Sequence, residues 1–297
     1  MMNFKEKKNP IKPYIKLLRW DKPSGRLILL IPASWALWLT PSGPPSLEFY
    51  ILIILGTIFT SGAGCIANDI WDRNYDRKVE RTKNRPLANG SLKALNAKLL
   101  LSLMITLSLA TLLLIPSENK EISIKIATIS LPFILLYPSA KRWFKYPQVI
   151  LSICWGFSVL IPWSLMEGNI NLNIQLIACF FGTMFWTFGF DTVYAMSDKN
   201  DDINLGIKSS AISFRGEIIR PVSFCYFLTS ILIGISAFFS GVNLLFWPIF
   251  LLSFFGMQRE ILLLSNKDKV ITKYGKHFEN QVKLGSLILL ALIIGKI

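Results

Sequence analysis

The stretch EFYILIILGTIFTSGAGCIANDIWD, residues 48–72, decides the fold because it is apolar over the length of a membrane crossing and then ends in acids. A helix needs about 20 predominantly apolar residues to span a hydrocarbon core roughly 30 Å thick. The apolar run is continuous rather than alternating, so it predicts a helix. Acids in such a span are costly in lipid and usually line a cavity, bind a cation or move protons.

Similar apolar runs recur along the whole chain of 297 residues, of which 52% are hydrophobic and only 17% are charged. This composition differs from that of soluble domains, and only helices or closed barrels satisfy their backbone groups in lipid. We therefore expect an all-α integral membrane protein, with residues 1–297 forming one polytopic domain. The predicted spans lie at about 27–41, 48–72, 95–116, 122–138, 148–166, 172–197, 218–239, 242–264 and 279–296.

The basic residues are distributed unevenly between the two sides of the membrane. All Lys and Arg residues except Lys120, Lys125 and Lys296 fall in the N-terminal arm or around the loops after the second, fourth, sixth and eighth spans. Because basic residues near span ends are retained in the cytoplasm, we expect the N-terminus and these loops there, and the C-terminus outside. The net charge of +14 then reflects topology and anionic lipid headgroups rather than nucleic-acid binding.

Two acidic clusters are predicted on the cytoplasmic side. Asp69, Asp72 and Asp76 are spaced i, i+3 and i+7, which places them on one face of a helix. The second cluster lies in FDTVYAMSDKNDDINLGIKSSA, residues 190–211. If the sixth span continues as a helix, one face carries Asp191, Tyr194, Asp198, Asp201 and Asp202.

Converging carboxylates repel one another unless a cation neutralises them. Oxygen ligands suit Mg²⁺, which is commonly held by one or two carboxylates together with substrate phosphates. Basic residues adjoin both clusters, as phosphate binding requires: Arg73, Arg77, Lys83 and Arg85 near the first, Lys199 and Lys208 near the second. The pattern therefore favours a diphosphate held between two Asp-bound Mg²⁺ ions.

Two other interpretations of the acids remain. Each cluster could be a solvated face whose acids pair with neighbouring bases, although two clusters on the same side make this less attractive. The acids could also couple ions to transport. Against a transporter, they lie at span ends, and no pair of spans broken by Gly or Pro stands out near the midplane.

His277 is the single histidine of the chain, which excludes a His-rich metal site or a His-based catalytic triad. It falls between the predicted spans 242–264 and 279–296, so we expect a solvated loop residue. The four cysteines lie inside predicted spans without close pairing and are expected to be small apolar packing residues.

The motifs resemble those of the UbiA superfamily of intramembrane aromatic prenyltransferases, most closely its 4-hydroxybenzoate polyprenyltransferases. The signature N-D-x-x-D-x-x-x-D is matched by residues 68–76, and D-x-x-x-D is matched by Asp198 and Asp202. The context extends the match through RWDKPSGRLILLIP (residues 19–32), RTKNRPL (81–87) and YPSAKRWFKYPQ (137–148).

The resemblance implies nine transmembrane helices around a central cavity that is capped by cytoplasmic loops and open sideways to lipid. It implies Mg²⁺ ligands at Asn68, Asp72, Asp76, Asp198 and Asp202, with Asp72 and Asp198 serving catalysis. Asp69 matches the signature too, but is expected to support the helix end more than the metal. Diphosphate would be bound by Lys83, Arg85 and Lys208.

The acceptor side is expected to involve Asp191, Tyr194 and Arg142. Asp191 could orient or deprotonate a phenol, or be a buried acid satisfied by Tyr194 or a backbone group. Arg142 could pair with the carboxylate of 4-hydroxybenzoate, or anchor its loop to lipid headgroups.

The resemblance implies transfer of a polyprenyl group from polyprenyl diphosphate to the carbon ortho to the hydroxyl of 4-hydroxybenzoate. The product would enter ubiquinone or plastoquinone biosynthesis, and a bacterial plasma membrane is the expected location. Haem and homogentisate remain alternative acceptors, because sister families share variants of the first motif.

Overall fold

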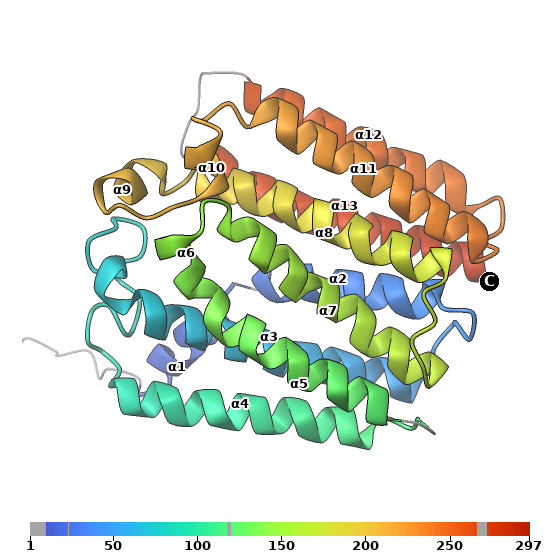
Figure 1. Cartoon of the computed structure of the whole chain (residues 1–297), viewed down its shortest axis with the longest axis horizontal. Coiled ribbons are helices and arrows are strands. Elements are labelled where there is room, and N and C mark those ends of the chain that lie inside the picture. The colour runs from blue at the N-terminus through green and yellow to red at the C-terminus, as the bar shows by residue number, and fades with distance from the viewer. Residues whose placement is uncertain (1–9, 23, 118–119, 266–271) are drawn as a thin grey trace, which may run out of the picture.

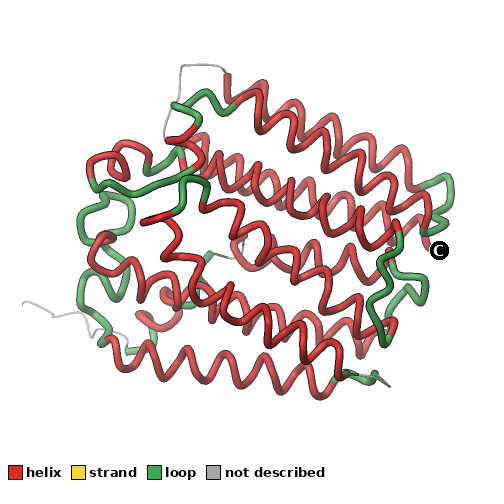
Figure 2. Tube along the Cα trace, viewed as in Figure 1, coloured by secondary structure: helices red, strands yellow, loops and turns green. Residues whose placement is uncertain are grey.

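The computed structural model describes residues 10–22, 24–117, 120–265 and 272–297, and these contain helices and loops but no strand (Figures 1 and 2). Eight helices are long and apolar enough to cross a membrane, and a ninth apolar helix, Ser24–Leu39, is shorter at 16 residues. In the described part of the chain, each predicted span therefore corresponds to a helix. The prediction of an all-α membrane protein is confirmed, and the count of nine holds with one short member.

Most helices follow one another with short connections, but a longer one, residues 77–93, joins α3 to α4. In chain order they are α1 (Lys12–Leu17), α2 (Ser24–Leu39), α3 (Leu47–Asp76), α4 (Ala94–Leu114), α5 (Glu121–Leu136), the 3₁₀ turn Tyr137–Ser139, α6 (Ala140–Trp143), α7 (Pro147–Glu167), α8 (Ile174–Ala195), α9 (Lys199–Asn204), α10 (Ser210–Ser213), α11 (Ile219–Phe239), α12 (Phe246–Ser265) and α13 (Thr272–Lys296).

Local sequence signals set the ends of the helices that carry the site. The Ser46 side chain accepts a hydrogen bond from the Phe49 backbone N–H at 3.3 Å and begins α3. Asn173 begins α8 in the same way, through the N–H of Leu176 at 2.9 Å. Pro147 occupies the first turn of α7, where its missing N–H costs little, and Gly168 ends that helix with φ of 66°.

The best-packed part of the bundle lies between α2, α7, α8, α11, α12 and α13. Its centre is aromatic: Trp35 and Trp186 are fully buried with ring centroids 5.0 Å apart, and Phe190 packs edge-on to Trp186. Helices α3, α4 and α5 lie on the other side, where α3 packs mainly on α4 (Figure 1). A cavity remains between these two groups of helices.

The short helices gather at one end of the bundle. Figure 1 shows α1, α6, α9 and α10 there, together with the connection between α3 and α4, whereas the C-terminus lies at the opposite end. These elements carry or adjoin most of the basic residues, as the topology prediction requires.

The prediction for His277 is wrong. Helix α13 begins at Thr272, and His277 is 1% exposed inside it, with its Nε2 2.7 Å from the Tyr226 hydroxyl and its Nδ1 3.6 Å from a Glu260 oxygen. The first turns of α13 are polar, so a hydropathy profile placed the start of this helix several residues too late. A buried imidazole is tolerated there because α11 and α12 supply polar partners.

Candidate active site

A single cavity of about 1080 Å³ joins the two acidic motifs to the apolar interior of the bundle. Asn68, Asp72, Asp76, Asp191, Asp198 and Asp202 all line it near the end that carries the short helices. Its far part is lined by Ala33, Ile115 and Leu165. Ile115 and Leu165 lie at the C-terminal ends of α4 and α7, which are the ends away from the short helices. The cavity thus has one charged end and a long apolar body.

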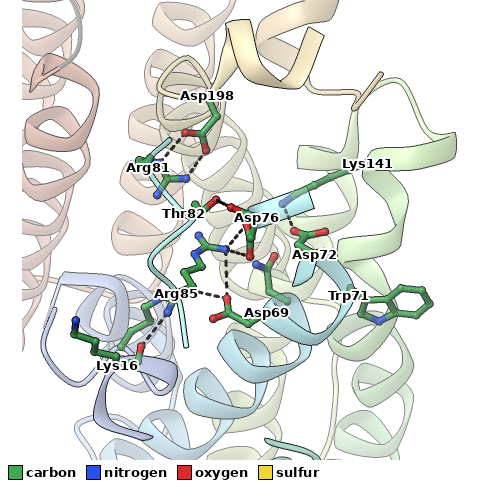
Figure 3. Close-up of polar contacts among 12 residues, drawn as sticks. Lys16, Asp69, Trp71, Asp72, Asp76, Arg81, Thr82, Arg85, Lys141 and Asp198 are labelled. Carbon is green, nitrogen blue, oxygen red and sulfur yellow. Dashed lines mark hydrogen bonds and ion pairs between the residues drawn. The ribbon is translucent and has the colours of Figure 1, made fainter. Parts of the chain in front are cut away.

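The first motif lies on one face of a continuous helix, as its spacing predicted. Helix α3 extends to Asp76, and Asp69, Asp72 and Asp76 are 0%, 7% and 6% exposed. Buried carboxylates need charged partners, and each of them has one (Figure 3).

Asp69 and Asp76 bind arginines from two different segments. The Arg85 Nη1 lies 2.9 Å from an Asp76 oxygen and 3.3 Å from Asp69 Oδ1, while Arg19 Nη2 is 2.6 Å from the same Asp69 atom. Burial alone would lower the pKa of Arg19, but Asp69 outweighs this and raises it. Asp69 therefore joins the N-terminal segment to the connection after α3.

Asp72 binds the two basic residues of α6. The Lys141 Nζ lies 2.9 Å from Asp72 Oδ2, and the Arg142 Nη2 is 3.2 Å from Asp72 Oδ1. Lys141 lines the cavity. Arg142 is not itself in the lining, but it donates to the Trp71 carbonyl at 2.7 Å and stacks over the ring of Tyr75, which does line the cavity. The sequence reading selected Arg142 and missed its neighbour.

The second motif does not continue the helix that precedes it. Helix α8 ends at Ala195, and α9 begins at Lys199 with Asp198 as its N-cap residue. The shared helical face predicted for residues 191–202 is therefore broken. The chain turn nevertheless leaves Asp191, Tyr194, Asp198 and Asp202 facing the same cavity, while Asp201 is not in the lining.

Arg81, from the connection that follows the first motif, binds residues of the second motif. Its Nε donates to Asp198 Oδ1 at 2.7 Å, and its Nη2 binds the other Asp198 oxygen (Figure 3). Its Nη1 donates to the Tyr194 hydroxyl at 2.9 Å. Burial acts to lower the pKa of Arg81, but the hydrogen bond and charge of Asp198 hold it above its usual value. Arg81 was not singled out from the sequence.

The remaining predicted bases differ in position. Lys208 lines the cavity, with its Nζ donating to the Trp143 carbonyl at 3.1 Å. Lys83 does not line it: its ammonium lies 2.7 Å from Glu80 and its side chain is 47% exposed.

Asp202 differs from the other cavity acids. Its carboxylate has no hydrogen bond or ion pair with the part of the chain that the structure describes, and burial raises its pKa to about 6, only partly offset by the charge of Lys141. Such an acid is suited to receive a cation.

The donor set fits divalent cations bound with substrate oxygens. Within the described ranges, no three His, Cys, Asp or Glu side chains are grouped so as to hold a metal ion alone. Mg²⁺ sites commonly use one or two carboxylates and complete their coordination with water and phosphates. The oxygen donors of Asn68, Asp72, Asp76, Asp198 and Asp202 match that requirement.

Comparison with known proteins supplies the family. A sequence model described as the UbiA prenyltransferase family matches residues 29–280. The chain belongs to the UbiA prenyltransferase family. It is therefore an enzyme that transfers prenyl groups, and the transporter interpretation is set aside.

Relatives and solved structures agree with this membership. The chain is 39% identical to 4-hydroxybenzoate solanesyltransferase of Synechocystis sp. over 95% of this chain and 94% of that protein. It is 38% identical to 4-hydroxybenzoate octaprenyltransferase of Neisseria meningitidis serogroup B, over 80% of each. The apo structure of a UbiA homologue from Aeropyrum pernix K1 shares the fold, with a TM-score of 0.75, 20% identity, and coverage of 90% of this chain and 97% of that one.

A second solved structure, a UbiA homologue from Archaeoglobus fulgidus bound to DMAPP and Mg²⁺, has a TM-score of 0.67 and 18% identity, and covers 93% of this chain and 98% of that chain. At this identity it shows a common UbiA fold.

Proposed function

We propose that the chain transfers a polyprenyl group from polyprenyl diphosphate to the ring carbon ortho to the hydroxyl of 4-hydroxybenzoate. The observation that carries this proposal is the single cavity that joins carboxylates and bases at one end to an apolar body. A polyprenyl diphosphate has the same division between an anionic head and an apolar chain, so one molecule matches both parts of the cavity.

The acceptor is proposed from the relatives. The Synechocystis and Neisseria proteins are named for transfer to 4-hydroxybenzoate, one with a solanesyl and the other with an octaprenyl donor. Their similarity extends over most of this chain and supports the same acceptor here. Both donor lengths are therefore candidates, and the product would enter ubiquinone or plastoquinone biosynthesis.

We propose Asn68, Asp72, Asp76, Asp198 and Asp202 as the oxygen ligands of Mg²⁺, in two groups on either side of the diphosphate. The DMAPP- and Mg²⁺-bound homologue supports this choice of metal. When bound, Mg²⁺ would neutralise charge on the leaving diphosphate. Lys141, Arg81 and Arg85 now neutralise these acids, and their cationic groups become available to phosphate oxygens once the acids hold cations.

The bases at the cavity mouth assist departure of the diphosphate. Arg85 and Lys208 remain our proposed diphosphate ligands, and the position of Arg81 and Lys141 in the cavity lining adds these two. Positive charge near the bridging oxygen stabilises the departing diphosphate, so the allylic C–O bond breaks and leaves a resonance-stabilised carbocation. Lys83 stays a prediction from the motif, although its contact with Glu80 points it elsewhere.

The acceptor ring is proposed to lie near Asp191 and Tyr194, deeper than the diphosphate. Asp191 lines the cavity one helical turn before Tyr194, so its carboxylate is available to orient or deprotonate the phenol. The electron-rich ring forms the new C–C bond at the ortho carbon and then loses the proton of that carbon to diphosphate, a carboxylate or water. Arg142 remains our prediction for the residue that pairs with the acceptor carboxylate, although it contacts Asp72 and is not itself among the residues that line the cavity.

The membrane location protects the reaction. Water would capture the allylic cation, and the apolar residues that line most of the cavity exclude it. The chain is a multi-pass membrane protein by its helices. We further propose that it lies in a bacterial plasma membrane with its N-terminus and active-site end in the cytoplasm, and that the cavity opens sideways to admit the prenyl chain.

The test is product formation in washed membranes that contain the expressed chain, with radiolabelled 4-hydroxybenzoate, octaprenyl or solanesyl diphosphate, and Mg²⁺. We expect a labelled lipid that requires Mg²⁺ and that is absent with Asp72→Ala and Asp198→Ala. If the folded wild-type chain forms no such lipid with either donor but does prenylate homogentisate or haem, the acceptor assignment is wrong.

A further inference from the structure

A buried amide lies beside the proposed acceptor position and has no role in the reaction described so far. Gln148 occupies the first turn of α7, is 5% exposed and lines the cavity. An uncharged polar side chain buried in an apolar span needs hydrogen-bond partners to offset its desolvation.

The partners of Gln148 fix which way its amide points. The Ser210 backbone N–H donates to Gln148 Oε1 at 2.8 Å. A backbone N–H only donates, so the oxygen of the amide must face Ser210. The NH₂ group of Gln148 is thereby left for its other neighbour, the carboxylate of Asp191, which lines the same cavity and with which the Gln148 side chain interacts.

The same segment also holds the helix that carries Asp191. The hydroxyls of Ser210 and Thr192 are 2.7 Å apart, both residues are fully buried, and Thr192 directly follows Asp191 in α8. The Lys208 N–H donates to the Lys141 carbonyl at 2.7 Å. Gln148 thus stands at the junction of α7, α8 and the segment 208–210.

We propose that Gln148 is a positioning residue, whose NH₂ group holds the Asp191 carboxylate in the orientation that the acceptor requires while its oxygen ties down the segment after the second acidic motif. The inference rests on the proposed function, because it assigns Asp191 to the acceptor side. A carboxylate on a single Cβ rotates freely unless a directional donor fixes it, and an amide supplies that donor without adding charge beside the allylic cation.

The test is a double-mutant cycle in the full chain in membranes, using Gln148→Leu and Asp191→Asn singly and together. We expect Gln148→Leu to lower kcat by about 10- to 100-fold, the loss of a hydrogen bond to a charged group. The KM for polyprenyl diphosphate should change less than twofold. In the Asp191→Asn background, Gln148→Leu should cost at most about threefold more, because its target is already gone.

Two further variants separate positioning from a purely structural role. Gln148→Glu keeps an oxygen for the Ser210 N–H but faces Asp191 with a second carboxylate, so we expect normal thermal stability near neutral pH and a loss of kcat like that of Gln148→Leu. Ser152→Ala removes a hydroxyl one turn along α7 that donates to the backbone carbonyl of Gln148 at 2.7 Å. This variant leaves the Gln148 side chain unchanged and should retain wild-type kcat.

The outcomes are distinguishable. Equal losses from Gln148→Leu in both backgrounds would overturn the positioning role, since the residue would then act independently of Asp191. Full activity of Gln148→Glu would overturn it too. If Asp191→Asn itself keeps wild-type kcat, the proposed role of Asp191 fails first, and Gln148 loses its assignment with it. If Gln148→Leu does not fold, the cycle is run with Gln148→Glu.

Discussion

The two acidic motifs face the same cavity but are held in different ways. In the first, three carboxylates project from one face of the long helix α3, and each is bound by an Arg or Lys. In the second, the chain leaves α8 and turns, so that Asp198 is bound by Arg81, while Asp202 has no hydrogen bond or ion pair with the described residues. The carboxylates of the first motif are therefore held in place by ion pairs within the fold, whereas the second motif contains an acid that is suited to bind a cation.

This difference suggests separate contributions. Side chains on a packed helix keep their geometry when the cavity fills, so the first motif would set the position of the diphosphate. The second follows a short turn and a six-residue helix, elements that adjust more easily to a bound ligand. The variants below test whether the first motif controls the chemistry and the second controls cation affinity.

The largest effect is expected from the first motif. Asp72→Asn should lower kcat/KM by about 1,000-fold, because a lost metal ligand removes several kcal/mol of charge stabilisation at the leaving group. The measurement is prenyl transfer in membranes at saturating Mg²⁺. Asp201→Asn is the matched control from the second motif, since Asp201 is outside the cavity lining and its carboxylate accepts a hydrogen bond from the Glu80 N–H at 3.3 Å. Similar losses from both variants would contradict the assignment.

Within the first motif, Asp69 should act on stability rather than on metal binding. Its carboxylate is fully buried and shared by Arg19 and Arg85, so Asp69→Asn leaves two cations without their common partner. Breaking such a buried pair costs about 3 kcal/mol. We expect a lower thermal unfolding temperature in detergent with an unchanged apparent Mg²⁺ affinity of the folded fraction. An unchanged melting temperature with weakened Mg²⁺ affinity would make Asp69 a ligand instead.

The second motif should give the cation affinity a pH dependence. The pKa of Asp202 is raised to about 6, so its carboxyl is neutral below that pH and is then a poor cation ligand. The Mg²⁺ concentration needed for half-maximal activity should therefore rise by about tenfold as pH falls from 7.5 to 5.0, because the ionised fraction of a carboxyl with this pKa falls by that factor.

Asp202→Asn supplies the control for that profile. It should need more Mg²⁺ at every pH and should flatten the dependence between pH 7.5 and 5.0, because the titrating group is gone. A profile that stays as steep in Asp202→Asn would place the titration on another residue.

The sequence predicted most of the fold because membrane helices have a characteristic length and a continuous apolar sequence. Span length and continuous hydropathy are direct consequences of the lipid solvent, and they located α3, α7 and α8 within a few residues. The polar start of α13 was not predicted as helix. Its polar residues bind partners on other helices, and a hydropathy profile does not distinguish such residues from those of a loop.

The site was predictable only where helical register holds. Asp69, Asp72 and Asp76 follow the period of α3, so their common face could be deduced. Residues beyond a helix end have no such period. The choice between Lys141 and Arg142, or between Arg81 and Lys83, depends on one or two residues of loop path that spacing does not encode.

The smallest predicted effect tests that choice between Arg81 and Lys83. Both are basic residues of the same connection between α3 and α4, but Arg81 lines the cavity and Lys83 contacts Glu80. We expect Arg81→Gln to raise the KM for polyprenyl diphosphate by about tenfold, the value of one charge-assisted hydrogen bond, and Lys83→Gln to change it by less than twofold. The pair is matched in net charge, so a general change in the potential at the cavity mouth affects both alike. A larger rise in KM from Lys83→Gln than from Arg81→Gln would contradict this choice. It would mean that the connection moves when the donor binds and brings Lys83 to the diphosphate, so that the surroundings of the first motif would be less fixed than helix α3 suggests.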